Sequence, residues 1–126
     1  MSQMSDLHRE AMALADEADR LRRQGNFPSA QEQLRRAFES ERRAAEMSGA
    51  EMELEPTRSV LHRSAAALAL ECGEYREAER LIAAALAGNP PEQIAEELRD
   101  LLAQVYFDRP PRARRRSLTP PQEPPS

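Results

Sequence analysis

The sequence predicts an all-α protein of about five helices that pair into antiparallel hairpins. Three observations predict this class. Ala, Glu, Leu and Arg fill 70 of the 126 positions, and all four are strong helix formers. Val, Ile and Thr, which strands prefer, fill only six positions. Glycines and prolines divide most of the chain into segments of helix length.

The first two helices are predicted on either side of Gly25. Apolar residues recur at three- and four-residue spacings over residues 4–24, and Gly25 follows where a helix favours a left-handed C-terminal cap. The second helix is predicted to begin after Asn26 and to continue to about residue 48. These two helices should therefore form one hairpin with a tight turn at the glycine.

The next two helices should follow a loop at residues 49–56. Pro56 ends this loop, because the residue before a proline avoids the helical conformation. The third helix is predicted at about 57–72, where its many alanines allow a close approach to a neighbour. The fourth is predicted at about 75–87, after Gly73.

The fifth helix has the clearest start signal in the chain. Asn89 is a good N-cap, Pro90 suits the first helical position, and Glu92 can reach back to the amide of the cap residue. A stripe of aliphatic residues then continues to about residue 106. The sequence therefore predicts a fifth helix that starts at this cap.

Charge separates the chain into two parts. Residues 1–107 carry 13 arginines against 20 acidic residues, a net charge of −7, whereas residues 108–126 carry five arginines against two acidic residues. The second part also holds six of the ten prolines and only one large apolar residue, Leu118. Such a segment buries too little apolar surface to offset its ordering entropy. We therefore expect a helical domain at 1–107 and a disordered Arg/Pro-rich tail at 108–126.

A repeat with an offset of 48 residues relates the two predicted hairpins. The matched pairs are Gly25 and Gly73, Phe27 and Tyr75, Ala30 and Ala78, Leu34 and Ile82, and Ala37 and Ala85. The glycine permits a tight reversal between two helices, and the aromatic residue is expected to fill their junction. The small residues let the helices touch, and the large aliphatic residue fills the space beneath the next pair.

This pattern resembles the tetratricopeptide repeat. Ala18 and Ala66 stand where that family prefers a small residue in the first helix, and Pro90 stands where its second helix ends. Arg42 departs from the pattern, because the family has proline there. Over residues 4–106 the resemblance implies a short right-handed solenoid: two degenerate repeats and a C-terminal capping helix. The chain looks most like small bacterial proteins of this type, although an unrelated five-helix bundle would use the same residues.

The sequence offers little for catalysis. Its two histidines and one cysteine are scattered, and its glutamates alternate with arginines as surface charges do. We expect His62 to pack between helices and Cys72 to be a small packed thiol, since no neighbour obviously lowers its pKa. The sequence thus predicts a protein that is not an enzyme and that holds no metal or cofactor.

Composition also bears on partners and location. The tail arginines suit phosphate contacts, but the acidic body and the lack of aromatic residues in the tail favour a solvated tail over nucleic-acid binding. No stretch reaches the 18 to 20 apolar residues of a membrane span, and the N-terminus lacks the apolar segment of a signal peptide. With a single cysteine, these features predict a cytoplasmic protein without membrane contact.

The resemblance implies a partner-binding face formed by the first helix of each hairpin. The implied residues are Met12, Ala15, Asp19, Arg22, Arg23, Val60, Arg63, Ala67, Leu70 and Glu71. Arg22, Arg23 and Arg63 would offer forked donors to a carboxylate of the partner. We therefore expect a non-enzymatic adaptor that binds another protein or peptide. The alternative is a self-assembling adaptor whose end helices pair with a second copy.

Overall fold

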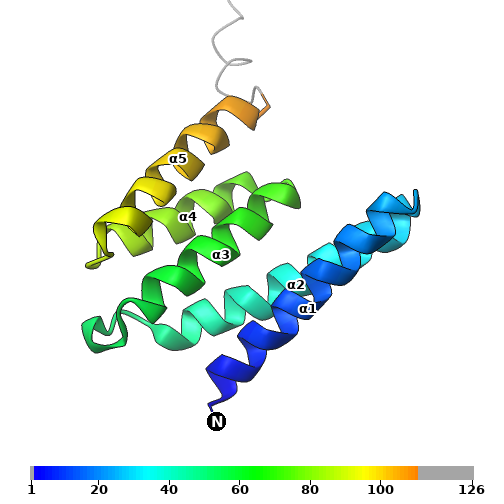
Figure 1. The fold of residues 1–126 in the computed structure, drawn as a ribbon. Helices are drawn as coiled ribbons and strands as arrows, with labels where there is room; N and C mark the ends of the chain where they lie inside the picture. Colours follow the sequence, from blue (N-terminus) through cyan, green and yellow to red (C-terminus); the bar gives the residue numbers. More distant parts are fainter. Residues whose placement is uncertain (1, 111–126) are drawn as a thin grey trace, which may run out of the picture.

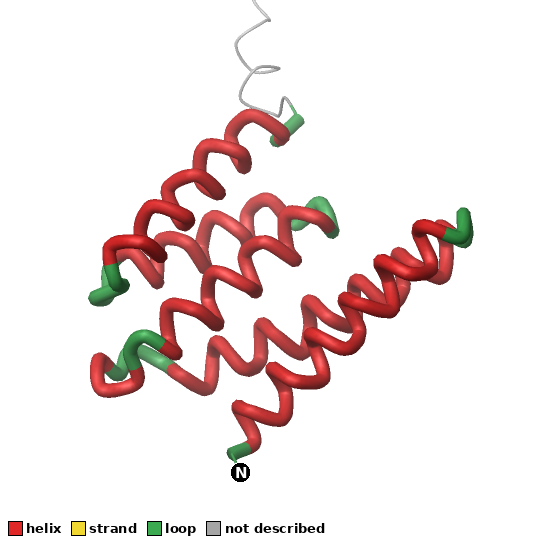
Figure 2. Tube along the Cα trace, viewed as in Figure 1, coloured by secondary structure: helices red, strands yellow, loops and turns green. Residues whose placement is uncertain are grey.

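The computed structural model describes residues 2–110, which form five α-helices and no strand (Figures 1 and 2). The helices are α1 (Gln3–Arg23), α2 (Phe27–Ser48), α3 (Thr57–Glu71), α4 (Tyr75–Leu86) and α5 (Glu92–Asp108), with one 3₁₀ turn, η1 (Met52–Leu54), between α2 and α3. The all-α class and the number of helices are confirmed. The predicted disorder of the tail concerns residues that, from 111 onward, lie outside the described range.

Two glycines make the turns of the two hairpins. Gly25 and Gly73 have φ values of +83° and +77°, a conformation that residues with a side chain rarely adopt. The amide of Gly25 donates to the carbonyl of Arg22 at 2.9 Å, and the amide of Gly73 donates to that of Leu70 at 3.0 Å. Each glycine therefore closes its helix and reverses the chain, as the repeat predicts.

The start of α5 differs from the prediction. The helix begins at Glu92 with Pro91 as its cap residue and without a side-chain cap, whereas the backbone amide of Asn89 faces Glu55 Oε2 at 3.4 Å. The capping role predicted for Asn89 and the helical position predicted for Pro90 are wrong. The physical reason is the second proline, because Pro91 keeps Pro90 out of the helical conformation.

The helices stack in chain order around α3. α1 packs along α2, α3 contacts α2, and α4 packs along α3; α5 then packs against both α3 and α4. The predicted packing residues Ala18, Ala30, Leu34, Ala37, Ala66, Ala78, Ile82 and Ala85 are all buried. One continuous core links the two hairpins and α5.

The two aromatic residues of the repeat differ in their surroundings. Tyr75 packs partly buried against the core, but 62% of the Phe27 surface is exposed, so the prediction that Phe27 fills its hairpin junction is wrong. The tip of the α1–α2 hairpin diverges from the tip of α3–α4 (Figure 1). Because α1 and α2 are longer than α3 and α4, Phe27 lies beyond the neighbours that would cover it.

Within residues 2–110, none of the helices combines the length and apolar character that crossing a bilayer requires. This agrees with the sequence, in which charged residues interrupt every helix.

Candidate functional site

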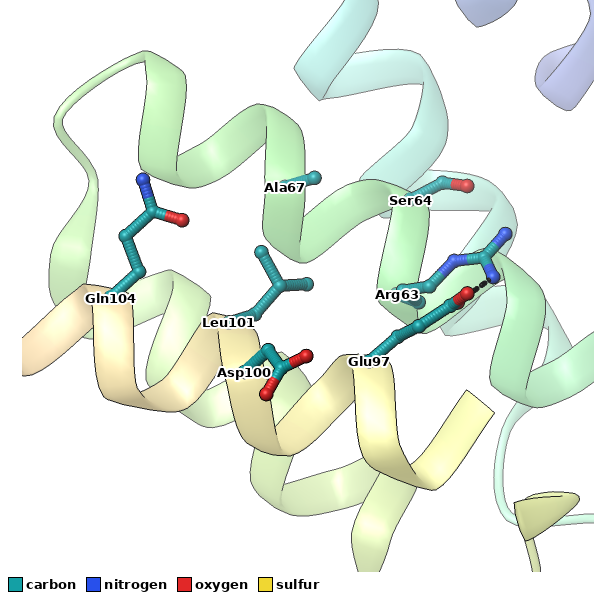
Figure 3. A pocket seen from close by; sticks show the side chains of 7 residues that line it. All are labelled: Arg63, Ser64, Ala67, Glu97, Asp100, Leu101 and Gln104. Carbon is teal, nitrogen blue, oxygen red and sulfur yellow. Dashed lines mark hydrogen bonds and ion pairs between the residues drawn. The ribbon is translucent and has the colours of Figure 1, made fainter. Parts of the chain in front are cut away.

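Two grooves flank α3 on one face of the domain. The α1–α3 groove has a volume of about 240 Å³ and is lined by Ala15, Asp16, Ala18, Asp19, Arg22, Leu34, Leu68 and Glu71. The α3–α5 groove has a volume of about 380 Å³ and is lined by Arg63, Ser64, Ala67, Glu97, Asp100, Leu101 and Gln104 (Figure 3). The α3 residues of both grooves follow one helical stripe at three- and four-residue spacings, so the grooves share a ridge and form one face.

The α3–α5 groove has an apolar centre. Figure 3 shows Leu101 of α5 reaching toward Ala67 of α3, whose small side chain leaves the space open. The ion pair of Arg63 and Glu97 bridges the two helices at one end of the groove. Gln104 lies at the other end. An extended segment with an apolar residue at its middle would fit this arrangement.

The α1–α3 groove is more polar. Buried apolar side chains, among them Leu34 and Leu68, form its base, while the acidic residues Asp16, Asp19 and Glu71 border it. Asp19 accepts hydrogen bonds from both Arg22 and Arg23, one turn further along α1. This groove is therefore bordered mainly by carboxylates, of which only Asp19 forms ion pairs within the described part of the chain.

The structure divides the residues that were predicted to bind a partner. Ala15, Asp19, Arg22 and Glu71 border the α1–α3 groove, and Arg63 and Ala67 border the α3–α5 groove. The remaining four, Met12, Arg23, Val60 and Leu70, line neither groove. Leu70 instead packs against the core.

The charge of this face is negative. Its carboxylates are Asp16, Asp19, Glu71, Glu97 and Asp100, against the two guanidinium groups of Arg22 and Arg63. Both arginines are already paired within the domain. Among residues 2–110, the side chains of Asp16, Glu71 and Asp100 have no hydrogen-bond or ion-pair partner. The face therefore suits cationic groups of a ligand better than carboxylates.

Sequence reasoning missed the contribution of α5. Its four groove residues were not predicted, because this helix was expected only to cap the end of the domain. A signal was present: Asp100 and Gln104 stand four residues apart beside Leu101, so one helix face combines polar rims with an aliphatic residue.

A buried polar cluster fixes the start of α3 against its neighbours. Arg58 donates through Nε to the carbonyl of Gly49 at 2.7 Å and through Nη2 to that of Ala84 at 3.0 Å. Glu55 accepts hydrogen bonds from the backbone amide and the hydroxyl of Ser59, at 3.1 and 2.7 Å. Nη1 of Arg58 is buried 3.7 Å from Glu55 Oε2 and has no hydrogen-bond partner. The cluster joins the ends of α2 and α4 to α3.

His62 and Cys72 are packing residues in this structure. Nδ1 of His62 lies 2.8 Å from the carbonyl oxygen of Arg58, and burial lowers the pKa of the imidazole. Burial also raises the pKa of the Cys72 thiol. The raised pKa keeps the Cys72 thiol neutral, which is its unreactive form.

A second buried charge joins α1 to α2. Glu41 is fully buried on α2, and Nδ1 of His8 on α1 lies 2.8 Å from its Oε2 and 3.1 Å from its Oε1. Burial raises the pKa of Glu41, although the hydrogen bond from His8 acts in the opposite direction. Glu41 lies on the stripe of Leu34, Ala37 and Phe38, so the period of α2 already placed it inward.

In the part of the chain that the structure describes, no group of three or more His, Cys, Asp or Glu side chains is placed to hold a metal ion. The chain matches no known protein-family profile, no curated protein and no solved structure. The geometry of the two grooves is therefore the basis for a functional proposal.

Proposed function

We propose that this protein is a non-enzymatic interaction module that binds an extended segment of a partner protein in the α3–α5 groove. The observation that carries the proposal is the open, apolar centre of this groove between two packed helices, with Ala67 and Leu101 at its centre and charged residues at its edges. Apolar surface at the centre of a polar rim is the usual anatomy of a protein interface.

The charges suggest the chemistry of the segment. Asp100 lies at the edge of the groove and has no partner among the described residues. Among the same residues, the carboxylate of Glu97 is paired only with Arg63. A segment that places an aliphatic side chain against Leu101 and a basic side chain beside Asp100 would satisfy both features. We further propose that the two hairpins stack as tetratricopeptide repeats do. We also propose that the protein binds its partner in the cytoplasm.

The experiment is a selection of binders from a random peptide library. The selected peptides should carry basic and aliphatic residues, and their Kd should be measured for two variants with the same chemical change. Ala67→Arg fills the groove, whereas Ala83→Arg adds the same side chain at an exposed position of α4.

We expect Ala67→Arg to weaken binding at least tenfold and Ala83→Arg to change it less than twofold. Circular dichroism should show both variants folded. Equal affinities for the two variants would refute the groove as the binding site, and a library that yields no binder would refute the proposed module.

Self-assembly is the second candidate, and one observation favours it. Phe107, at the end of α5, has 87% of its surface exposed, and its neighbour Tyr106 has 56% exposed. Large exposed apolar side chains at the end of a helical stack are suited to pairing with a second copy. Light scattering over a range of protein concentrations separates the candidates, because a constant mass of 14.2 kDa excludes obligate self-assembly. If a dimer forms, Phe107→Ser should dissociate it.

A further inference from the structure

The α3–α5 groove and the arginines of the C-terminal sequence carry opposite charges. Asp100 has no partner in residues 2–110, and Glu96 is exposed four residues earlier on α5. The sequence after α5 reads Arg-Pro-Pro-Arg-Ala-Arg-Arg-Arg and has no acidic residue before Glu123. The chain thus holds both a negatively charged groove and a strongly basic segment that follows one of its walls.

The point where the chain leaves α5 favours a contact between the two. Arg109 is anchored by an ion pair to Glu79 of α4 at 2.5 Å and lies over the ring of Tyr106 at 5.1 Å. Its ψ of 129° ends the helix in an extended conformation. Because Gln104 lies at the end of the groove opposite Glu97 (Figure 3), and α5 ends four residues later at Asp108, the chain leaves the helix near the Gln104 end.

The reach of the basic segment matches the length of the groove. Asp100 precedes Arg109 by nine residues, which is roughly 13 Å along a helix at 1.5 Å per residue. The arginines at 112–116 follow Arg109 by three to seven residues, which span at most roughly 10 to 25 Å. A segment that turns back can therefore place one arginine beside Asp100 and another beside Glu97.

The path back along α5 also passes an exposed aromatic ring. Phe107 follows Asp100 by seven residues and Gln104 by three, so it lies on the same face of the helix. Its ring is 87% exposed and offers a surface on which a guanidinium group can stack.

We propose that residues 112–116 of this chain dock in the α3–α5 groove through arginine–carboxylate contacts and compete there with the partner segment. The competition with a partner segment rests on the proposed function, whereas the docking of residues 112–116 does not depend on it. Because the segment is tethered, its effective concentration is of millimolar order, so a contact too weak to form between separate molecules is populated within one.

A paramagnetic label on the full chain tests the contact. The native thiol is removed by Cys72→Ser, and a nitroxide is attached to a new thiol introduced by Ser117→Cys. The NMR signals of the backbone amides are then compared between the paramagnetic label and its reduced, diamagnetic form. We expect broadening for Arg63, Ala67 and Glu97, which lie away from the point where the segment is tethered, and none for the first turn of α1, which lies far from the end of α5 (Figure 1). The broadening should weaken as NaCl rises from 0.05 to 0.5 M, because salt screens exposed charges.

Two variants with the same change of charge serve as a matched pair. Asp100→Arg should abolish the groove broadening, whereas Glu32→Arg, an exposed position on α2, should leave it intact. A mixture of isotope-labelled chain and separately spin-labelled chain detects contacts between copies. Groove broadening that is absent, that survives Asp100→Arg, or that arises only between copies overturns the proposal.

The effect on the partner segment is measured separately. Replacing Arg112, Arg114, Arg115 and Arg116 by Gln should lower the Kd of a library-selected peptide about fivefold if the wild-type segment covers the groove four-fifths of the time. An unchanged Kd would refute competition. Peptide binding that is lost in Ala67→Arg but insensitive to the tail would sustain the proposed function while refuting this inference.

Discussion

The two sides of α3 are built differently. On the α1–α2 side, the groove is bordered by acidic side chains, and a fully buried glutamate with one histidine partner joins α1 to α2. On the α4–α5 side, the groove has an apolar centre, and at the start of α3 a buried arginine ties the end of α4 to the end of α2 through two carbonyl groups. The groove beside α5 therefore keeps an apolar centre open for a ligand, whereas the groove beside α1 is bordered mainly by carboxylates, two of which have no partner among residues 2–110.

Arg58→Met should have the largest effect on this comparison. It removes the donors to Gly49 and Ala84 and leaves the carboxylate of Glu55 nearly buried without a cation. We expect a loss of about 2 to 4 kcal/mol in the free energy of unfolding, measured by urea titration. The control is Arg63→Met, which removes a partly exposed ion pair and should cost less than about 1 kcal/mol. Equal losses would contradict the anchoring role of Arg58.

Gly88→Ala should have the next largest effect on the same side. A Cβ atom at Gly88 would lie 2.4 Å from Nη1 of Arg58, whose guanidinium is held in place by its carbonyl partners. We expect a loss of about 1 to 2 kcal/mol in the urea titration. In an Arg58→Met background the same change should cost much less, because the clashing group is gone. Additive losses would show that the two residues do not interact.

The helices themselves were predictable because each depends on local signals. The predicted ranges differ from the observed ends by no more than one residue for the first four helices, since glycines and apolar periodicity mark them. The buried charges were not predicted. Arginine is ordinarily a surface residue, so nothing local identifies Arg58 as the residue that three separate elements enclose. The α3–α5 groove likewise depends on how two helices approach, which composition does not determine.

Glu41 and His62 should make the free energy of unfolding depend on pH with opposite signs. The raised pKa of Glu41 means that the folded state holds this proton more tightly, so stability falls as pH rises from 4.5 through the raised pKa. The lowered pKa of His62 means the reverse: stability falls as pH falls from 6.5 through the lowered pKa.

Urea titrations at several pH values on two variants check these signs. Glu41→Gln should remove the loss of stability that occurs as pH rises above 4.5. His62→Leu should remove the loss of stability that occurs as pH falls below 6.5. If either variant keeps the wild-type pH profile, the corresponding group is not the source of that dependence.

The smallest effects are expected from the exposed arginines of α1. Arg22→Gln and Arg23→Gln each break one exposed ion pair with Asp19, so the free energy of unfolding should change by less than about 0.5 kcal/mol. If ligands bind only beside α5, peptide Kd should also change less than twofold. A large loss of affinity would restore the α1–α3 groove as a binding site and remove the proposed difference between the two sides.

The most direct measurement maps a bound ligand on the wild-type protein. A library-selected peptide with a benzophenone group is photo-cross-linked, and the attached residues are identified by mass spectrometry. We expect cross-links to α3 and α5 around Ala67, Leu101 and Gln104. Cross-links concentrated on α1 around Ala15 and Asp16, or spread over all helices, would show that the α3–α5 groove is not the docking site.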